Sequence, residues 1–164
     1  MKVLSILRHA KSSWKDDSLD DHDRPLSKRG LRDAPRMGQL LRDQGLVPEA
    51  ILSSTARRAR ETALAVAAAT GFPDDVRFAR SLYASSPDEY LQALSELPDT
   101  AGHVLVVGHN PTVEALLAVL VGEGHEMPTA ALAIVELAIE SWRDLDPVPR
   151  GSLRALWRPR ELRD

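Results

Sequence analysis

Short apolar runs alternate with helical patterns along this chain, and that alternation constrains the fold most strongly. Strands are expected over residues 1–7, 50–53, 76–78, 104–108, 131–137 and 153–157. Helices are expected from Ser27, a predicted N-cap, to Gly45, and over 56–70, 86–97 and 112–121. Strands that alternate with helices are joined by crossovers, which favour a largely parallel sheet covered on both faces. We therefore expect an α/β fold: one three-layer α/β/α domain over residues 1–164, with a mostly parallel central sheet.

Size, charge and cysteine content exclude several classes of protein. The 164 residues suffice for one domain, and 21 Lys and Arg against 24 Asp and Glu argue against a nucleic-acid partner bound by bulk positive charge. The chain has no cysteine, which excludes disulfides and metal sites built on sulfur. It shows no secretory signal and no apolar run long enough for a membrane span. We expect a cytoplasmic protein with no membrane partner.

Basic side chains follow three of the expected strands. Arg8 and His9 come directly after the first strand, and His109 follows 104–108. Three arginines lie in the helix that follows the second strand: Arg57, Arg58 and Arg60. Taken singly, each is typical of a hydrogen-bonded or solvated surface residue. Parallel strands open on one edge, however, so together these side chains predict a cationic pocket suited to a phosphoryl group.

The order and spacing of several motifs resemble a known family. The motifs are Arg8-His9-Ala10 with Ser12 and Trp14, Pro25-Leu26-Ser27, Ser53-Ser54 with Arg58-Ala59, and Val107-Gly108-His109-Asn110-Pro111. This set resembles the histidine phosphatase (phosphoglycerate mutase-like) superfamily, and residues 8–14 resemble its SixA-type phosphohistidine phosphatase branch. The resemblance implies a phosphoglycerate mutase-like fold and a hydrolase related to the histidine acid phosphatases.

The resemblance also implies roles for individual residues. His9 would be the nucleophile that forms a phosphohistidine intermediate, and Arg8, Arg58 and His109 would bind the phosphoryl group, with His109 as an imidazolium. Ser12 is a further candidate for substrate binding. Cationic neighbours would keep His9 neutral, and no metal or cofactor is required. The family spacing selects Arg58; its neighbour in sequence, Arg57, is the alternative.

One departure from the family pattern concerns the proton donor. Many members carry a glutamate acid where this chain has only residues 82–86, which include no carboxylate. Asp88 and Glu89 are the nearest candidates, and they are equally typical of carboxylates at a helix start. An alkoxide leaving group requires an acid, whereas the imidazole of phosphohistidine requires less help. This departure favours phosphohistidine, most of all on a protein, as the substrate.

Two alternatives use the same pocket. One is a broad phosphomonoesterase acting on small phosphorylated molecules, and the other is a non-catalytic module that binds a phosphorylated ligand. The acidic segment 15–25 is expected to be a surface loop with His22 in solvent, and His103 and His125 receive no role. The sequence leaves the oligomeric state, the proton donor and the physiological substrate open.

Overall fold

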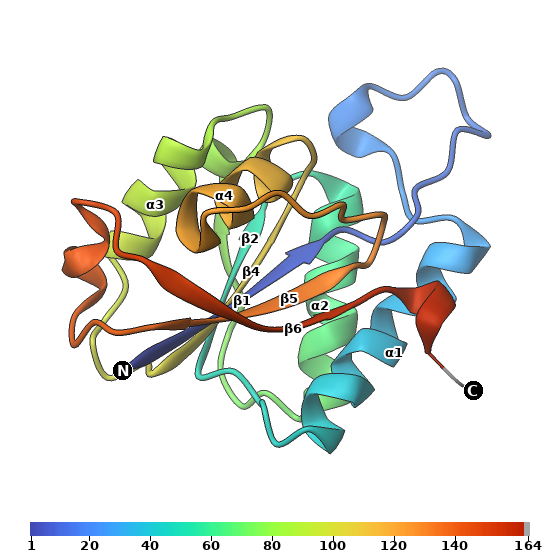
Figure 1. The fold of residues 1–164 in the computed structure, drawn as a ribbon. Helices are drawn as coiled ribbons and strands as arrows, with labels where there is room; N and C mark the ends of the chain where they lie inside the picture. Colours follow the sequence, from blue (N-terminus) through green and yellow to red (C-terminus); the bar gives the residue numbers. More distant parts are fainter. Residues whose placement is uncertain (163–164) are drawn as a thin grey trace.

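A computed structural model of the chain describes residues 1–162 and is built around one six-stranded sheet (Figure 1). The last two residues of the expected 1–164 domain lie outside the described residues. The strands are β1 Lys2–Arg8, β2 Ala50–Ser54, β3 Arg77–Ala79, β4 His103–Gly108, β5 Leu132–Leu137 and β6 Gly151–Trp157. They lie in the order β3-β2-β4-β1-β5-β6.

Helices cover both faces of the sheet. They are α1 Lys28–Asp43, α2 Arg57–Thr70, α3 Pro87–Ser95 and α4 Thr112–Val121. Short 3-10 turns lie at Asp21–Asp23, Arg80–Leu82, Trp142–Leu145 and Pro159–Glu161. Figure 1 shows α1 and α2 on one face and α3 and α4 on the other, each pair with its own apolar core against the sheet. The expected three-layer α/β/α fold is confirmed. Within residues 1–162, no helix combines the length and apolarity that crossing a membrane requires.

The direction of the strands fixes where the site lies. β1 and β2 both pair in parallel with β4, so that Arg8 lies opposite Gly108 and Ser53 opposite Val107. β5 runs antiparallel to β1 and to β6, which makes the sheet mostly rather than wholly parallel. The carboxyl ends of three neighbouring strands, β2, β4 and β1, therefore meet at one edge.

Local signals set the helix boundaries close to their expected positions. The Ser27 hydroxyl accepts a hydrogen bond from the amide of Gly30 at 3.1 Å and begins α1. Gly71 ends α2 with a φ of 77°, a conformation that glycine adopts readily. α1 and α2 pack closely at Gly38, where a Cβ atom would lie 2.7 Å from the Cβ of Ala69.

The segment between β1 and α1 lies mostly at the surface, as expected, and backbone contacts hold it at its base. It projects from the carboxyl end of β1 (Figure 1) and is closed at its base by a bridge between Ser12 and Leu26. The amide of Ser13 also donates to the carbonyl of Pro25 at 2.8 Å. These contacts hold the 3-10 turn Asp21–Asp23 over the edge where the three strands end.

Candidate active site

His9 leaves the end of β1 with its ring orientation fixed by the backbone. Its Nδ1 lies 2.7 Å from the carbonyl oxygen of Ala10. A carbonyl only accepts hydrogen bonds, so Nδ1 carries the hydrogen and Nε2 keeps its lone pair. The Ala10 amide donates to the hydroxyl of Thr62 in α2 at 3.0 Å, which anchors this turn to the helix. His9 is buried, and the contact with Ala10 leaves its Nε2 as the basic nitrogen.

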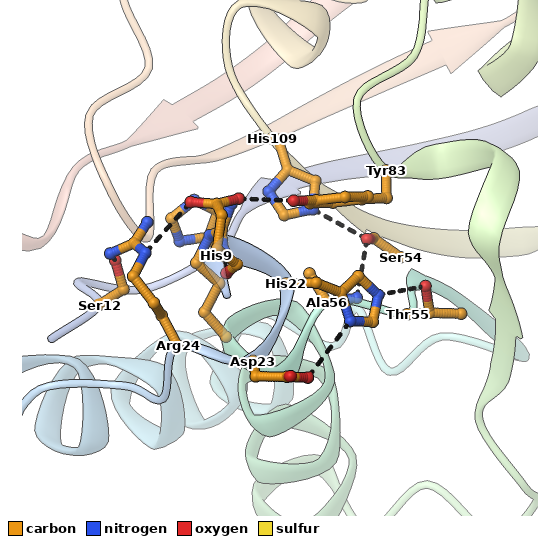
Figure 2. A network of polar contacts seen from close by, with 12 residues as sticks. His9, Ser12, His22, Asp23, Arg24, Ser54, Thr55, Ala56, Tyr83 and His109 are labelled. Carbon is orange, nitrogen blue, oxygen red and sulfur yellow. Dashed lines mark hydrogen bonds and ion pairs between the residues drawn. The ribbon is translucent and has the colours of Figure 1, made fainter. Parts of the chain in front are cut away.

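His109 follows β4 and lies beside His9. Figure 2 shows the two side chains next to each other, and their ring centroids are 5.1 Å apart. The Nε2 of His109 contacts the hydroxyl of Ser54, the last residue of β2, at 2.8 Å. The Ser54 oxygen already accepts from the amide of Ala56, so its hydroxyl is free to donate to Nε2. A hydroxyl that donates to Nε2 favours the tautomer of His109 with its hydrogen on Nδ1.

Tyr90 positions His109 from behind. The Tyr90 hydroxyl accepts a hydrogen bond from the amide of His109 at 3.2 Å and donates to the carbonyl of Leu82 at 2.9 Å. Gly108 permits this approach, because a Cβ atom there would overlap the Tyr90 side chain. Burial raises the pKa of Tyr90 to about 12, so its hydroxyl stays protonated.

Burial keeps both histidines neutral. Burial is the largest cause that lowers the pKa of His9 to about 4, and Arg58, Arg8 and Arg24 lower it further. Burial, followed by His9 and Arg58, lowers the pKa of His109 to about 3. The expectation of a neutral His9 agrees with this pKa, although burial outweighs the cationic neighbours. Burial disfavours the expected imidazolium at His109 in the site without an anion, and for the site with a bound phosphoryl group it stays a prediction.

Arg8 and Arg58 bring two guanidinium groups to the histidines. The Nη1 of Arg8 donates to the carbonyl of Met127 at 3.2 Å. Both terminal nitrogens of Arg58 donate to Asp21, to its carbonyl at 2.7 Å and to its carboxylate at 3.0 Å. Arg57 instead points outward and pairs with Glu61 at 3.6 Å. The structure thus brings Arg58, and not Arg57, into the cluster.

Three buried hydrogen-bonding atoms of this cluster have no partner within the described residues. They are the Nε of Arg8, the Nε of Arg58 and the Nδ1 of His109. Buried polar groups in proteins are nearly always satisfied, so three unpartnered atoms in one cluster indicate a polar ligand. The two guanidinium nitrogens can only donate, and Nδ1 donates in the tautomer that Ser54 favours. The cluster is therefore suited to an anion with several oxygens.

The segment 15–25 contributes a third guanidinium that the sequence reasoning missed. Arg24 is buried; its Nε donates to the Asp21 carboxylate at 3.1 Å and its Nη1 to the Ser12 hydroxyl at 2.8 Å (Figure 2). The guanidinium carbon lies 3.5 Å from the ring centroid of Trp14. The predicted binding residue Ser12 thus reaches the cluster through Arg24. The only sequence signal for Arg24 was its place directly before the Pro25-Leu26-Ser27 motif.

The interpretation of His22 as a solvated loop residue is wrong. Its side chain is 26% exposed, and its Nε2 contacts the Thr55 hydroxyl at 2.9 Å. Its ring packs at right angles to that of Tyr83, with the ring centroids 4.8 Å apart. Tyr83 in turn lies 5.6 Å from His109, centroid to centroid. His22 and Tyr83 therefore form one wall of the cluster, which local sequence patterns did not indicate.

The two carboxylates considered as proton donors lie elsewhere. Asp88 and Glu89 are exposed on the first turn of α3. Asp88 lines a groove with Leu145 and Val148, and Glu89 lines another with Arg77. Neither groove includes His9 or His109, so the structure does not bring these carboxylates to the cluster. Both lie where a helix start favours negative charge.

Comparison with known proteins identifies the family of the chain. Residues 4–82 match the family model described as histidine phosphatase superfamily (branch 1). The solved structure titled as the putative phosphohistidine phosphatase SixA from Agrobacterium tumefaciens is 30% identical, with a TM-score of 0.83 over 96% of this chain and 98% of that one. The chain belongs to the histidine phosphatase superfamily, in its SixA-type branch.

The chain is also similar to two further proteins. An uncharacterised protein of Mycobacterium tuberculosis is 38% identical over 152 residues, which cover 86% of this chain and 92% of the relative. The structure of the protein histidine phosphatase SixA complexed with tungstate is 28% identical, with a TM-score of 0.82 over 98% of this chain and 99% of that one. The chain is thus a phosphatase of this superfamily, and its substrate is phosphorylated.

Proposed function

We propose that this phosphatase hydrolyses phosphohistidine, most of all on proteins, through a covalent intermediate on His9. The single observation that carries the proposal is the group of three unpartnered buried atoms, on Arg8, Arg58 and His109, beside a histidine whose Nε2 lone pair is free. A phosphoryl group supplies the oxygens that those atoms require. A SixA neighbour was solved in complex with tungstate, a tetrahedral oxyanion, which supports an anion of this shape as the ligand.

In this proposal, His9 acts first as the nucleophile. Its neutral ring attacks phosphorus through Nε2, the bond from phosphorus to the leaving nitrogen breaks, and a bond from phosphorus to Nε2 forms. Water then attacks the phosphorus of phospho-His9 and releases inorganic phosphate. The lowered pKa of His9, about 4, supports this role because the lone pair is available throughout the neutral range.

The cations of the cluster would stabilise the charge that develops on the phosphoryl oxygens. Arg8 and Arg58 supply fixed N–H donors, and His109 adds a neutral one through Nδ1. Donors that are already oriented need no rearrangement as the reaction proceeds, which is the largest contribution in many enzymes. This arrangement needs neither a metal nor a cofactor.

The chemistry of the carboxylates supports an imidazole as the leaving group. Asp21 is the carboxylate bound to Arg58, and its pKa is held at about 2, first by the hydrogen bond from Tyr83 and then by Arg58. It is therefore ionised near neutral pH and cannot donate a proton. An imidazole can leave after protonation on its other nitrogen, whereas an alkoxide would need a positioned acid.

The expectation of a cytoplasmic location stays a prediction.

Replacement of the nucleophile tests the mechanism. We expect His9→Ala to abolish release of phosphate from phosphoramidate and from a phosphohistidine protein, because the other imidazole of the cluster, His109, has its Nε2 engaged by Ser54. Wild-type protein denatured in alkali during turnover should carry phosphate on His9, since phosphorus–nitrogen bonds survive alkali. Mass spectrometry of the digested protein locates the label.

Two comparisons make this test specific. His125→Ala removes a histidine that pairs with Glu123 in the turn after α4, and it should keep wild-type turnover. Wild-type protein should hydrolyse phosphoramidate faster than an alkyl phosphate by about 10²-fold or more, the usual contribution of a missing acid. Full activity in His9→Ala, or phosphate on another residue, would refute the mechanism; equal rates on both substrates would favour a phosphomonoesterase.

A further inference from the structure

The carboxylate of Asp21 lies between two cations of the proposed phosphate pocket. Its Oδ2 accepts from the Nη2 of Arg58 at 3.0 Å and from the hydroxyl of Tyr83 at 2.6 Å. Its Oδ1 accepts from the Nε of Arg24 at 3.1 Å. Asp21 is half-exposed, while both guanidinium groups are buried. The carboxylate therefore binds the outer edges of Arg58 and Arg24.

Asp21 uses only some of the N–H donors of Arg58 and Arg24. Arg58 uses both terminal nitrogens on Asp21, and its Nε remains unpartnered toward the cluster. Three arginines with two neutral histidines would give the pocket three positive charges, and Asp21 offsets one of them. The pKa of Asp21, lowered to about 2 by Tyr83 and Arg58, keeps that offset in place near neutral pH.

The charge balance matters because the proposed reaction ends with free phosphate, itself an anion. A pocket that binds the product as tightly as the transition state gains no turnover from that binding. We propose that Asp21 is a positioning residue that holds Arg58 and Arg24 and weakens the affinity of the pocket for phosphate, so that the product leaves. This inference rests on the proposed function.

Tyr83 has the opposite effect on the affinity of the pocket for phosphate. Its hydroxyl donates to Asp21, and that hydrogen bond shares the carboxylate's negative charge. The bond raises the pKa of Tyr83, which stays protonated as the donor. Without the hydroxyl, more of the carboxylate's charge acts on Arg58, and the pocket attracts phosphate less.

Calorimetric titration with inorganic phosphate near neutral pH, at one ionic strength, tests this inference on the full chain. We expect Asp21→Asn to tighten the Kd of phosphate by about tenfold, because one unit of repulsion next to the anion is removed. The KM for phosphoramidate should fall with it, while kcat does not rise. Tyr83→Phe should weaken phosphate binding.

Asp23→Asn is the matched control, since it removes the same charge two residues away. Asp23 is exposed and pairs with His22 at 3.6 Å, outside the arginine contacts. Its Kd for phosphate should stay within about twofold of the wild-type value, because an exposed charge is screened by salt. If Asp21 had a purely structural role, Asp21→Asn would instead weaken phosphate binding, because a loosened Arg58 would bind the anion less well.

Several outcomes would overturn the inference. They are an unchanged or weaker Kd in Asp21→Asn, equal tightening in Asp23→Asn, and unchanged or tighter binding in Tyr83→Phe. If Asp21→Asn does not fold, as judged by circular dichroism, the Tyr83→Phe result alone decides the sign. A wild-type protein that neither binds phosphate nor turns over phosphoramidate would instead refute the proposed function.

Discussion

Two adjacent arginines of one helix have different surroundings. Successive residues of an α-helix point about 100° apart. Arg58 is therefore buried against Asp21 and the histidines, while Arg57 lies in solvent beside Glu61. The two side chains have the same chemistry, so their different positions allow a direct test of the site.

Replacement of each arginine in turn gives that test. Arg58→Ala should lower kcat/KM on phosphoramidate by about 10²–10³, the usual loss when one oriented donor to a transition state is removed. Arg57→Ala should stay within about threefold, because it loses only an exposed ion pair. Steady-state kinetics on the two purified variants make the comparison. Equal losses in the two variants would show that charge alone, and not the placed guanidinium, matters.

Sequence reasoning found the residues that follow strands directly and missed those brought in by the loop. His9 and His109 were predictable because a strand end positions the next residue. Arg24 reaches the cluster through contacts with Trp14 and Ser12, and Tyr83 through a hydrogen bond to Asp21. The periodicity of the sequence does not predict these tertiary contacts. The burial of His109, which lowers its pKa, was not predictable for the same reason, since burial depends on the packed neighbours.

At the scale of elements, α1 and α2 pack closely at Gly38. A Cβ atom there would lie 2.7 Å from the Cβ of Ala69 and 2.9 Å from the carbonyl oxygen of Val66. The helical period predicted both helices, and the near agreement of their ends with expectation follows from the cap at Ser27 and the stop at Gly71. The crossing itself could not be predicted, because it depends on which glycine faces the partner helix.

Gly38→Ala should destabilise the protein by about 1–3 kcal/mol, because the added methyl overpacks the contact. Alanine otherwise stabilises a helix interior by about 1 kcal/mol relative to glycine, so the sign is informative. Gly124→Ala, where no atom lies within 4 Å of the added Cβ, should change stability by about 0.5 kcal/mol or less. Urea denaturation measures both, and a stabilised Gly38→Ala would contradict the packing.

At the scale of the whole molecule, three buried histidines link folding to pH. Burial is the largest cause that lowers the pKa of His103 to about 4, at the opposite end of the sheet from His9 and His109. Its Nε2 contacts the buried hydroxyl of Ser5 at 2.6 Å. The alternation of strands and helices predicted the layers that bury these rings, whereas the direction of β5, antiparallel to both of its neighbours, was not resolved by the pattern.

Stability should therefore fall as the solution becomes acidic. Each of these histidines has a folded pKa of about 3 to 4, below the unfolded value of about 6.5, so the unfolded chain binds more protons. The free energy of unfolding should be constant above about pH 7 and decrease from about pH 6.5 toward pH 4. The Asp21 carboxylate has a pKa of about 2, so its stabilising contribution is lost only below about pH 4. Urea denaturation at a series of pH values tests this; a flat profile down to pH 4.5 would refute it.

The unpartnered buried atoms of Arg8, Arg58 and His109 also bear on how the protein can be engineered. Unpartnered buried groups lower the free energy of unfolding of the protein without ligand, and many proteins lose stability in this way at sites that activity requires. A selection for heat resistance alone would favour apolar replacements at these positions and discard the chemistry. A screen that includes a phosphate mimic would instead reward variants that keep the three side chains, because the bound anion repays their burial.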